Sequence, residues 1–184
     1  MKNNKISLET YFWSSQDIED PFELLDTFFE YANLDYYKET LDQALLYTNK
    51  LEIYKIENPG QSFVFYTSLR SFVRCCSLLQ FKDKNWKIKK PSKYLSCLCQ
   101  GSLTFEEFQN PFIVFKKAFA EITLEKYEFF LCEIVHLSLS PYAEEFEYDL
   151  ITPYVHLTKM LDASRLIHER GVKKLKDIKS GSAE

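Results

Sequence analysis

Glu133 and His136 have the spacing that most resembles a chemical site in this sequence. Residues three apart share one face of a helix, and a carboxylate and an imidazole arranged in this way bind metals in helical bundles. His156, in a later helical segment, would complete a mixed site if the two helices were adjacent. Such centres need several Glu-x-x-His motifs, and no second one occurs in the chain. A metal-dependent bundle enzyme therefore ranks last among three hypotheses for function, and we expect no cofactor.

The cysteine and glycine patterns do not fit a known kind of catalytic site. The five cysteines lack the Cys-x2–4-Cys spacing of structural zinc sites, and Cys132, one turn before His136, has no third group to orient it. With only four glycines, the chain has no phosphate-binding loop and no nucleophile elbow. Catalysis is therefore not predicted, although the sequence alone leaves the question open.

Cysteine usage and hydropathy both favour a cytoplasmic location. An odd number of cysteines, in a chain long enough to bury a core without disulfides, is typical of reduced thiols. The N-terminal segment lacks the apolar stretch of a secretory signal, and no span of the length of a membrane helix is free of charged residues. We therefore expect a cytoplasmic protein without a membrane partner.

A basic segment lies in the middle of an otherwise acidic chain. Residues 61–100 contain eight bases and one acid, a net charge of +7, whereas the whole chain has a net charge of −4. Lysines in this segment could neutralise phosphates while an indole stacks on a base. The alternative function is therefore nucleic-acid or anion binding through residues 70–93, unless this is a solvated loop that balances the acidic helices. The residues that would bind the anion are Arg70, Arg74, Lys84, Trp86, Lys87, Lys89 and Lys90.

Aromatic residues supply the leading hypothesis for function. Phe, Tyr and Trp make up 16% of the chain, and many of them fall on the apolar stripes of expected helices. A few do not, and exposed aromatic side chains mark association surfaces. We therefore expect a non-catalytic interaction or regulatory module that binds a protein partner, or a second copy of itself, through these residues. They are Tyr11, Phe12, Trp13, Tyr36, Phe146 and Tyr148.

The elements that must position these residues are predicted to be helices. A shortage of glycine makes the many turns of an all-β fold difficult to build. Capping side chains that precede a proline, or that begin an apolar repeat, are typical of helix starts. The sequence therefore predicts an all-α, single-domain bundle of about six to eight helices. The expected caps are Asp20, Asp35, Thr104, Asn110, Thr123, Ser140 and Thr152.

The expected boundaries follow from these caps and from the apolar periods. A segment at 1–19 precedes the helical domain at 20–171, which ends at a glycine, and residues 172–184 are predicted to be a flexible tail. Within the domain we expect a turn at Asn58-Pro59-Gly60 and a connector without regular structure at 82–93. The longer helices are predicted over 21–33, 36–50, 62–80, 124–138 and 153–170.

An internal repeat emerges when the sequence is compared with itself at an offset of 90 residues. Residues 20–45 then align with 110–135 without a gap, and six of the 26 pairs are identical. The expected caps of both helix pairs coincide as well. The two halves of the domain, 20–80 and 110–170, are therefore predicted to be related units, unless two similarly capped helix pairs arose without symmetry.

Overall fold

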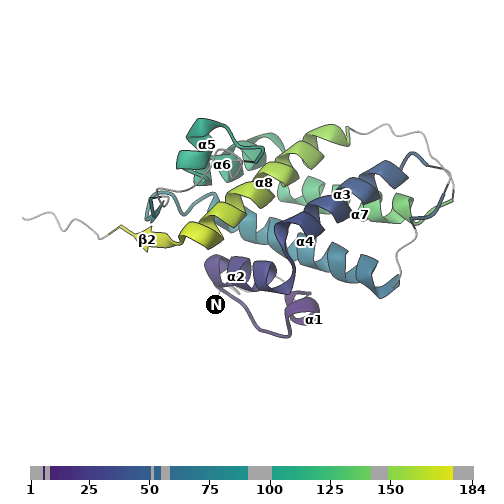
Figure 1. Cartoon of the computed structure of the whole chain (residues 1–184), viewed down its shortest axis with the longest axis horizontal. Coiled ribbons are helices and arrows are strands. Elements are labelled where there is room, and N and C mark those ends of the chain that lie inside the picture. Colours follow the sequence, from purple (N-terminus) through teal and green to yellow (C-terminus); the bar gives the residue numbers. More distant parts are fainter. Residues whose placement is uncertain are drawn as a thin grey trace, which may run out of the picture.

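The computed structural model describes residues 6, 9–50, 52–54, 59–90, 101–141 and 149–175. Within these ranges the chain forms eight helices and one two-stranded sheet (Figure 1), so the prediction of an all-α fold is confirmed. None of the helices in these ranges is long and apolar enough to cross a membrane. In chain order the elements are α1 (Thr10–Ser14), α2 (Pro21–Tyr31), α3 (Leu34–Tyr47), α4 (Pro59–Leu79), β1 (Trp86–Ile88), α5 (Phe105–Gln109), α6 (Phe112–Glu121), α7 (Leu124–Ser138), α8 (Ile151–Arg170) and β2 (Val172–Lys174).

Several helix starts are set by side chains that accept hydrogen bonds from unpaired backbone amides. Asp20 Oδ1 accepts a hydrogen bond of 2.7 Å from the amide of Phe22 at the start of α2, as predicted. Thr123 caps α7, also as predicted. At α3 the prediction is wrong by two residues, because the cap is Asn33 and the predicted Asp35 lies in the first turn.

Other predicted starts differ from the structure for local reasons. At α8, Asp149 Oδ1 accepts hydrogen bonds from two amides of the first turn at 2.9 and 3.1 Å, so the helix begins before the predicted cap, Thr152. At α4 the predicted turn is wrong, because Pro59 opens the helix, where its missing N–H loses no hydrogen bond. The side chain of Asn110 does not cap α6. The helix predicted after Ser140 falls on residues 142–148, which lie outside the described residues.

α4 lies at the centre of the fold and contacts α1, α2, α6 and α7 (Figure 1). Phe28 of α2 stacks on an α4 ring at 4.7 Å and on Tyr37 of α3 at 3.9 Å, measured between ring centroids. Stacked rings contribute stability beyond the area that they bury. The predicted apolar stripe of this central helix is buried throughout and comprises Phe65, Leu69, Phe72, Cys76 and Leu79.

Two short strands pair where the sequence predicts an irregular connector and a flexible tail. β1 and β2 are antiparallel, and their register places Lys87 opposite Lys173. Trp86 and Ile88 of β1 and Val172 of β2 pack against the core. Both predictions are wrong here because strands of three residues show too little alternation to be read from sequence, and the pairing joins segments that are far apart in the chain.

The two predicted halves make matching contacts. The Tyr37 hydroxyl donates to the carbonyl of Phe28 at 2.8 Å, and the Tyr127 hydroxyl, 90 residues later, donates to the carbonyl of Ala118 at 3.3 Å. α1 packs against α2 and α4, as α5 packs against α6 and α8. The strands that follow α4 and α8 pair with each other. These contacts support the predicted repeat, which stays a prediction.

A buried carboxylate fixes α8 within the core. Asp162, 6% exposed, forms an ion pair of 2.6 Å with Lys38 of α3 and accepts hydrogen bonds from the amide and hydroxyl of Ser102 at 2.8 and 2.7 Å. Gly101 has a φ of +59°, and a Cβ atom there would lie 2.5 Å from Asp162 Oδ2. The turn before α5 therefore needs glycine to approach this carboxylate.

Candidate functional site

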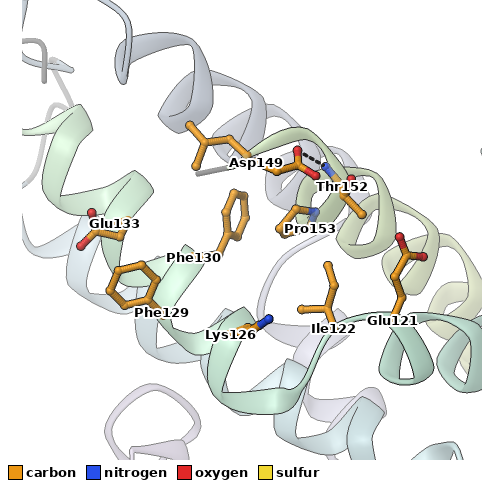
Figure 2. A pocket seen from close by; sticks show the side chains of 10 residues that line it. Glu121, Ile122, Lys126, Phe129, Phe130, Glu133, Asp149, Thr152 and Pro153 are labelled. Atoms are coloured by element: carbon orange, nitrogen blue, oxygen red, sulfur yellow. Dashed lines mark hydrogen bonds between the residues drawn. The ribbon is translucent and has the colours of Figure 1, made fainter. Parts of the chain in front are cut away.

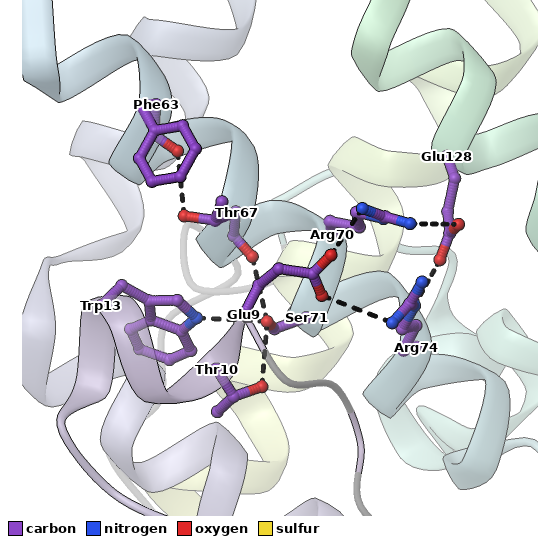
Figure 3. A network of polar contacts seen from close by, with 9 residues as sticks. All are labelled: Glu9, Thr10, Trp13, Phe63, Thr67, Arg70, Ser71, Arg74 and Glu128. Carbon is purple, nitrogen blue, oxygen red and sulfur yellow. Dashed lines mark hydrogen bonds and ion pairs between the residues drawn. The ribbon is translucent and has the colours of Figure 1, made fainter.

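Polar contacts hold α1 against α4 (Figure 3). Thr10 Oγ1 and Trp13 Nε1 both donate to Ser71 Oγ, at 3.0 and 3.1 Å, and Ser71 donates to the carbonyl of Thr67 at 2.9 Å. The indole also meets Phe28 edge-on. Because Trp13 is only 6% exposed, its predicted place on an exposed aromatic surface is wrong.

The same short helix directs two aromatic side chains into solvent. Tyr11 is 60% exposed and Phe12 is 71% exposed, because the residues on either side of them face α4. Tyr36 is half-buried and contacts the next ring along α3. The structure therefore places Tyr11 and Phe12 of the predicted aromatic surface in solvent, while Phe146 and Tyr148 lie outside the described residues.

Arg70 and Arg74 form a four-charge cluster with two glutamates (Figure 3). Arg70 contacts Glu9 at 2.6 Å and Glu128 at 3.3 Å, and Arg74 contacts Glu9 at 3.5 Å and also pairs with Glu128 through its Nε. Burial opposes ionisation of Glu128, but the hydrogen bonds from the two arginines outweigh it and lower the pKa of its carboxyl. The cluster is neutral overall, which argues against the predicted anion-binding role of both arginines.

The remaining basic residues lie elsewhere, around the β1–β2 pair. Trp86 is half-buried against Phe22, with ring centroids 4.9 Å apart, so its ring is packed rather than free to stack on a base as predicted. The lysines by contrast are exposed, and none of them forms an ion pair with another described residue. Four of these exposed lysines belong to the predicted anion-binding set, namely Lys84, Lys87, Lys89 and Lys90. Two more, Lys173 and Lys174, lie on β2.

The predicted metal ligands do not meet in one place. Glu133 and His136 lie on α7, whereas His156 of α8 contacts Glu121 at the end of α6, with 2.9 Å between Nε2 and Oε2. Within the described ranges no group of three or more His, Cys, Asp or Glu side chains could hold a metal ion. The geometry therefore gives the metal-enzyme hypothesis no support.

A pocket of about 470 Å³ opens between the α6–α7 turn, α7 and the first turn of α8 (Figure 2). Figure 2 shows Ile122, Phe130 and Pro153 around the hollow, with charged side chains beside them. Phe129 is 49% exposed at its edge. We call this site the α7–α8 pocket; the residues that line it are Glu121, Ile122, Lys126, Phe129, Phe130, Glu133, Asp149, Leu150, Thr152 and Pro153.

The charged residues of the α7–α8 pocket are mostly acidic. The lining contains three acids, Glu121, Glu133 and Asp149, and one base, Lys126, and Glu121 also contacts a histidine of α8. Hydrogen bonds from the side chain and amide of Thr152 lower the pKa of the Asp149 carboxyl, so it is ionised at neutral pH. The arrangement can hold an apolar group that carries a cation beside it.

Sequence reasoning missed this pocket, although one signal was present. Phe129 falls outside the apolar stripe of its helix, which comprises Tyr127, Phe130, Leu131 and Ile134, and its side chain is half-exposed. No protein-family model, curated protein or solved structure matches this chain.

Proposed function

We propose that this protein is a non-catalytic interaction module that binds a segment of a partner protein in the α7–α8 pocket. The observation that carries the proposal is the half-exposed Phe129 ring beside an apolar hollow of about 470 Å³ with acidic surroundings. That volume is typical of ligand pockets, and partly exposed aromatic side chains often anchor protein interfaces. The partner segment would insert an apolar side chain into the hollow and place a lysine or arginine near Glu133 and Asp149.

The predicted repeat gives an independent reason to single out this face of α7. At an offset of 90 residues, Phe129 and Phe130 correspond to Glu39 and Thr40 of α3. Glu39 is exposed, as expected on the outer face of an amphipathic helix. A phenyl ring at the matching position of α7 departs from that pattern, which supports a binding role for Phe129.

A partner protein fits this pocket better than α1 of a second copy of the chain. The exposed aromatic residues of α1 are Tyr11 and Phe12. Arg70 and Arg74, which contact Glu9 just before α1, are already matched by Glu9 and another carboxylate. These two cations are therefore not free for an acidic pocket, and the two exposed rings of α1 stay a predicted second contact surface.

The free thiols support the proposed cellular location of this module. Cys75 and Cys76 are buried and Cys132 is exposed, and all three are free. Free thiols are typical of proteins in reducing compartments. A cytoplasmic location therefore remains part of the proposal.

Peptide display against the full-length protein tests the proposal directly. We expect enrichment of sequences with a large apolar residue next to lysine or arginine. The selected peptides should bind Phe129→Ser and Glu133→Lys at least about tenfold more weakly than wild type, a loss typical of an interface anchor. Phe105→Ser is the matched control, because Phe105 of α5 is 73% exposed and lies outside the pocket.

Two outcomes would overturn the proposal. One is the absence of any enriched motif, or of any difference in affinity between wild type and Phe129→Ser. The other is concentration-dependent self-association in sedimentation velocity that Phe129→Ser abolishes, since the occupant would then be a second copy of the chain.

A further inference from the structure

A second surface lies at the opposite end of α8 from the pocket. The pocket contacts the first turn of α8, whereas β2 follows its last turn, and a helix of 20 residues spans about 30 Å (Figure 1). There β1 and β2 join two segments that are distant in the chain. We call residues 84–90 and 172–174 the lysine ribbon. Its six lysines, all exposed, are Lys84, Lys87, Lys89, Lys90, Lys173 and Lys174.

Backbone pairing holds these lysines close together. Lys87 and Lys173 are directly opposite each other in the antiparallel register. Side chains in such positions have Cβ atoms about 4.5–5.5 Å apart, and like charges there destabilise a sheet. The pairing continues beyond the strands, because Lys89 N donates to the carbonyl of Gly171 at 3.0 Å. The fold therefore keeps two cations side by side although they repel each other.

Two nearby carboxylates among the described residues do not neutralise the lysine ribbon. Asp83 and Glu169 each lie three residues before one of the strands. Asp83 pairs with Lys116 of α6, and Glu169 pairs with Arg165 at 2.6 Å. Within the described ranges none of the six lysines has an ion-pair partner, so their positive charge remains available to a ligand.

We infer that the lysine ribbon binds the phosphate backbone of nucleic acid. Trp86 and Ile88 of β1 pack against the core, so the residue between them, Lys87, holds the outward position of that strand. Its partner in the register is Lys173, and the outward positions of the two strands therefore carry only lysine. Lysine is depleted at protein–protein interfaces, whereas interfaces with nucleic acid are strongly positive. Alternate residues of an extended strand, such as Lys87 and Lys89, lie about 6.6 Å apart, close to twice the axial spacing of phosphates along one DNA strand. Charge and spacing therefore favour a polyphosphate over an acidic protein.

Fluorescence anisotropy with the full chain tests this inference. The probes are a labelled DNA duplex of about 20 base pairs and a single-stranded RNA of equal length, between about 20 and 200 mM salt. We expect the logarithm of the affinity for the duplex to fall with the logarithm of salt concentration, with a slope no steeper than about −5 for six phosphate contacts. The probe that binds more tightly identifies the form of nucleic acid.

Single substitutions locate the binding surface. Lys173→Gln and Lys87→Gln should each weaken binding and make the salt slope about one unit shallower. Lys50→Gln is the matched control, because Lys50 is exposed beyond the end of α3 and lies outside the ribbon. Thermal unfolding separates binding from folding, since Lys173→Gln removes a like-charge contact and should not lower the midpoint.

Four results would overturn the inference. The first three are that neither probe binds at low salt, that the affinity does not depend on salt, and that Lys173→Gln and Lys50→Gln have the same effect. A labelled polyglutamate peptide that binds more tightly than both probes would also overturn it and would assign the ribbon to an acidic protein. Phe129→Ser should bind both probes like wild type, so failure of the pocket proposal can be distinguished from failure of this one.

Discussion

Glu107 allows the contribution of a buried ion cluster to be measured. Its side chain is 3% exposed and accepts hydrogen bonds from the amide of Thr104 at 2.9 Å, from Lys159 Nζ at 2.9 Å and from Lys117 Nζ at 3.2 Å. Burial by itself raises the pKa of this carboxyl, but the three hydrogen bonds outweigh it and lower the pKa from 4.5 to about 2. The ionised carboxylate therefore ties α5 to α6 and α8.

The pKa of Glu107 sets both the size and the pH dependence of its effect. A shift from 4.5 to about 2 corresponds to about 3 kcal/mol of stability, at 1.36 kcal/mol per pKa unit. Because the folded pKa is depressed, this stability is present above the unfolded value near 4.5 and is lost as the pH falls toward 2. Glu107→Gln should therefore lower the free energy of unfolding by about 3 kcal/mol at pH 7 and by only about 1 kcal/mol at pH 3.

Urea denaturation of wild type and Glu107→Gln at pH 7, 5 and 3 measures this difference. Glu106→Gln is the control, because Glu106 is the adjacent carboxylate and its side chain is 71% exposed. We expect the control to change stability by less than about 0.5 kcal/mol at each pH. A loss below about 1 kcal/mol for Glu107→Gln at pH 7, or an equal loss at pH 7 and pH 3, would refute the reasoning.

Three further predictions concern single contacts. Tyr127→Phe removes the hydroxyl that donates to Ala118 and should lower the free energy of unfolding by about 1 kcal/mol in urea denaturation; no change would contradict this. Lys173→Glu replaces repulsion of Lys87 with attraction and should stabilise the protein by about 0.2–1 kcal/mol. Thermal unfolding at low salt measures this change, and a midpoint below that of wild type would contradict the prediction. Cys132 is exposed and should react with a thiol reagent in the native protein. The two cysteines of α4 should react only after unfolding, because burial raises the pKa values of their thiols. Mass spectrometry after timed labelling measures the three rates, and equal rates for all three cysteines would contradict the prediction.

Local signals predicted the helices because caps and apolar periods act within a few residues. Asp20 caps α2 as expected from the proline that follows it. The predicted caps that proved wrong had a competitor nearby. Asn33 replaces Asp35, and Asp149 replaces Thr152, because each lies one turn or less upstream and accepts hydrogen bonds from amides at the start of its helix. A capping rule names both candidates but does not rank them.

The features that the sequence did not predict depend on contacts between distant segments. Trp13 is buried because its indole N–H meets Ser71 of α4, 58 residues later. The lysine ribbon exists because Lys87 pairs in register with Lys173, which a local pattern cannot show. Phe129 was visible as an aromatic residue off its stripe, but the pocket beside it forms only when α7 packs near the first turn of α8.

α8 connects the two proposed binding surfaces and is fixed between them. Two residues of α8 form ion pairs with neighbouring helices: Asp162 with Lys38 of α3 at 2.6 Å, and Lys159 with Glu107 of α5 at 2.9 Å. A ligand at one end of α8 can change affinity at the other only if it shifts the helix between two arrangements. Sliding α8 would separate both ion pairs and leave the buried Asp162 without its partners, which is strongly destabilising. The geometry therefore favours two surfaces that bind independently, and a rigid helix would then hold a partner protein at a fixed distance from nucleic acid.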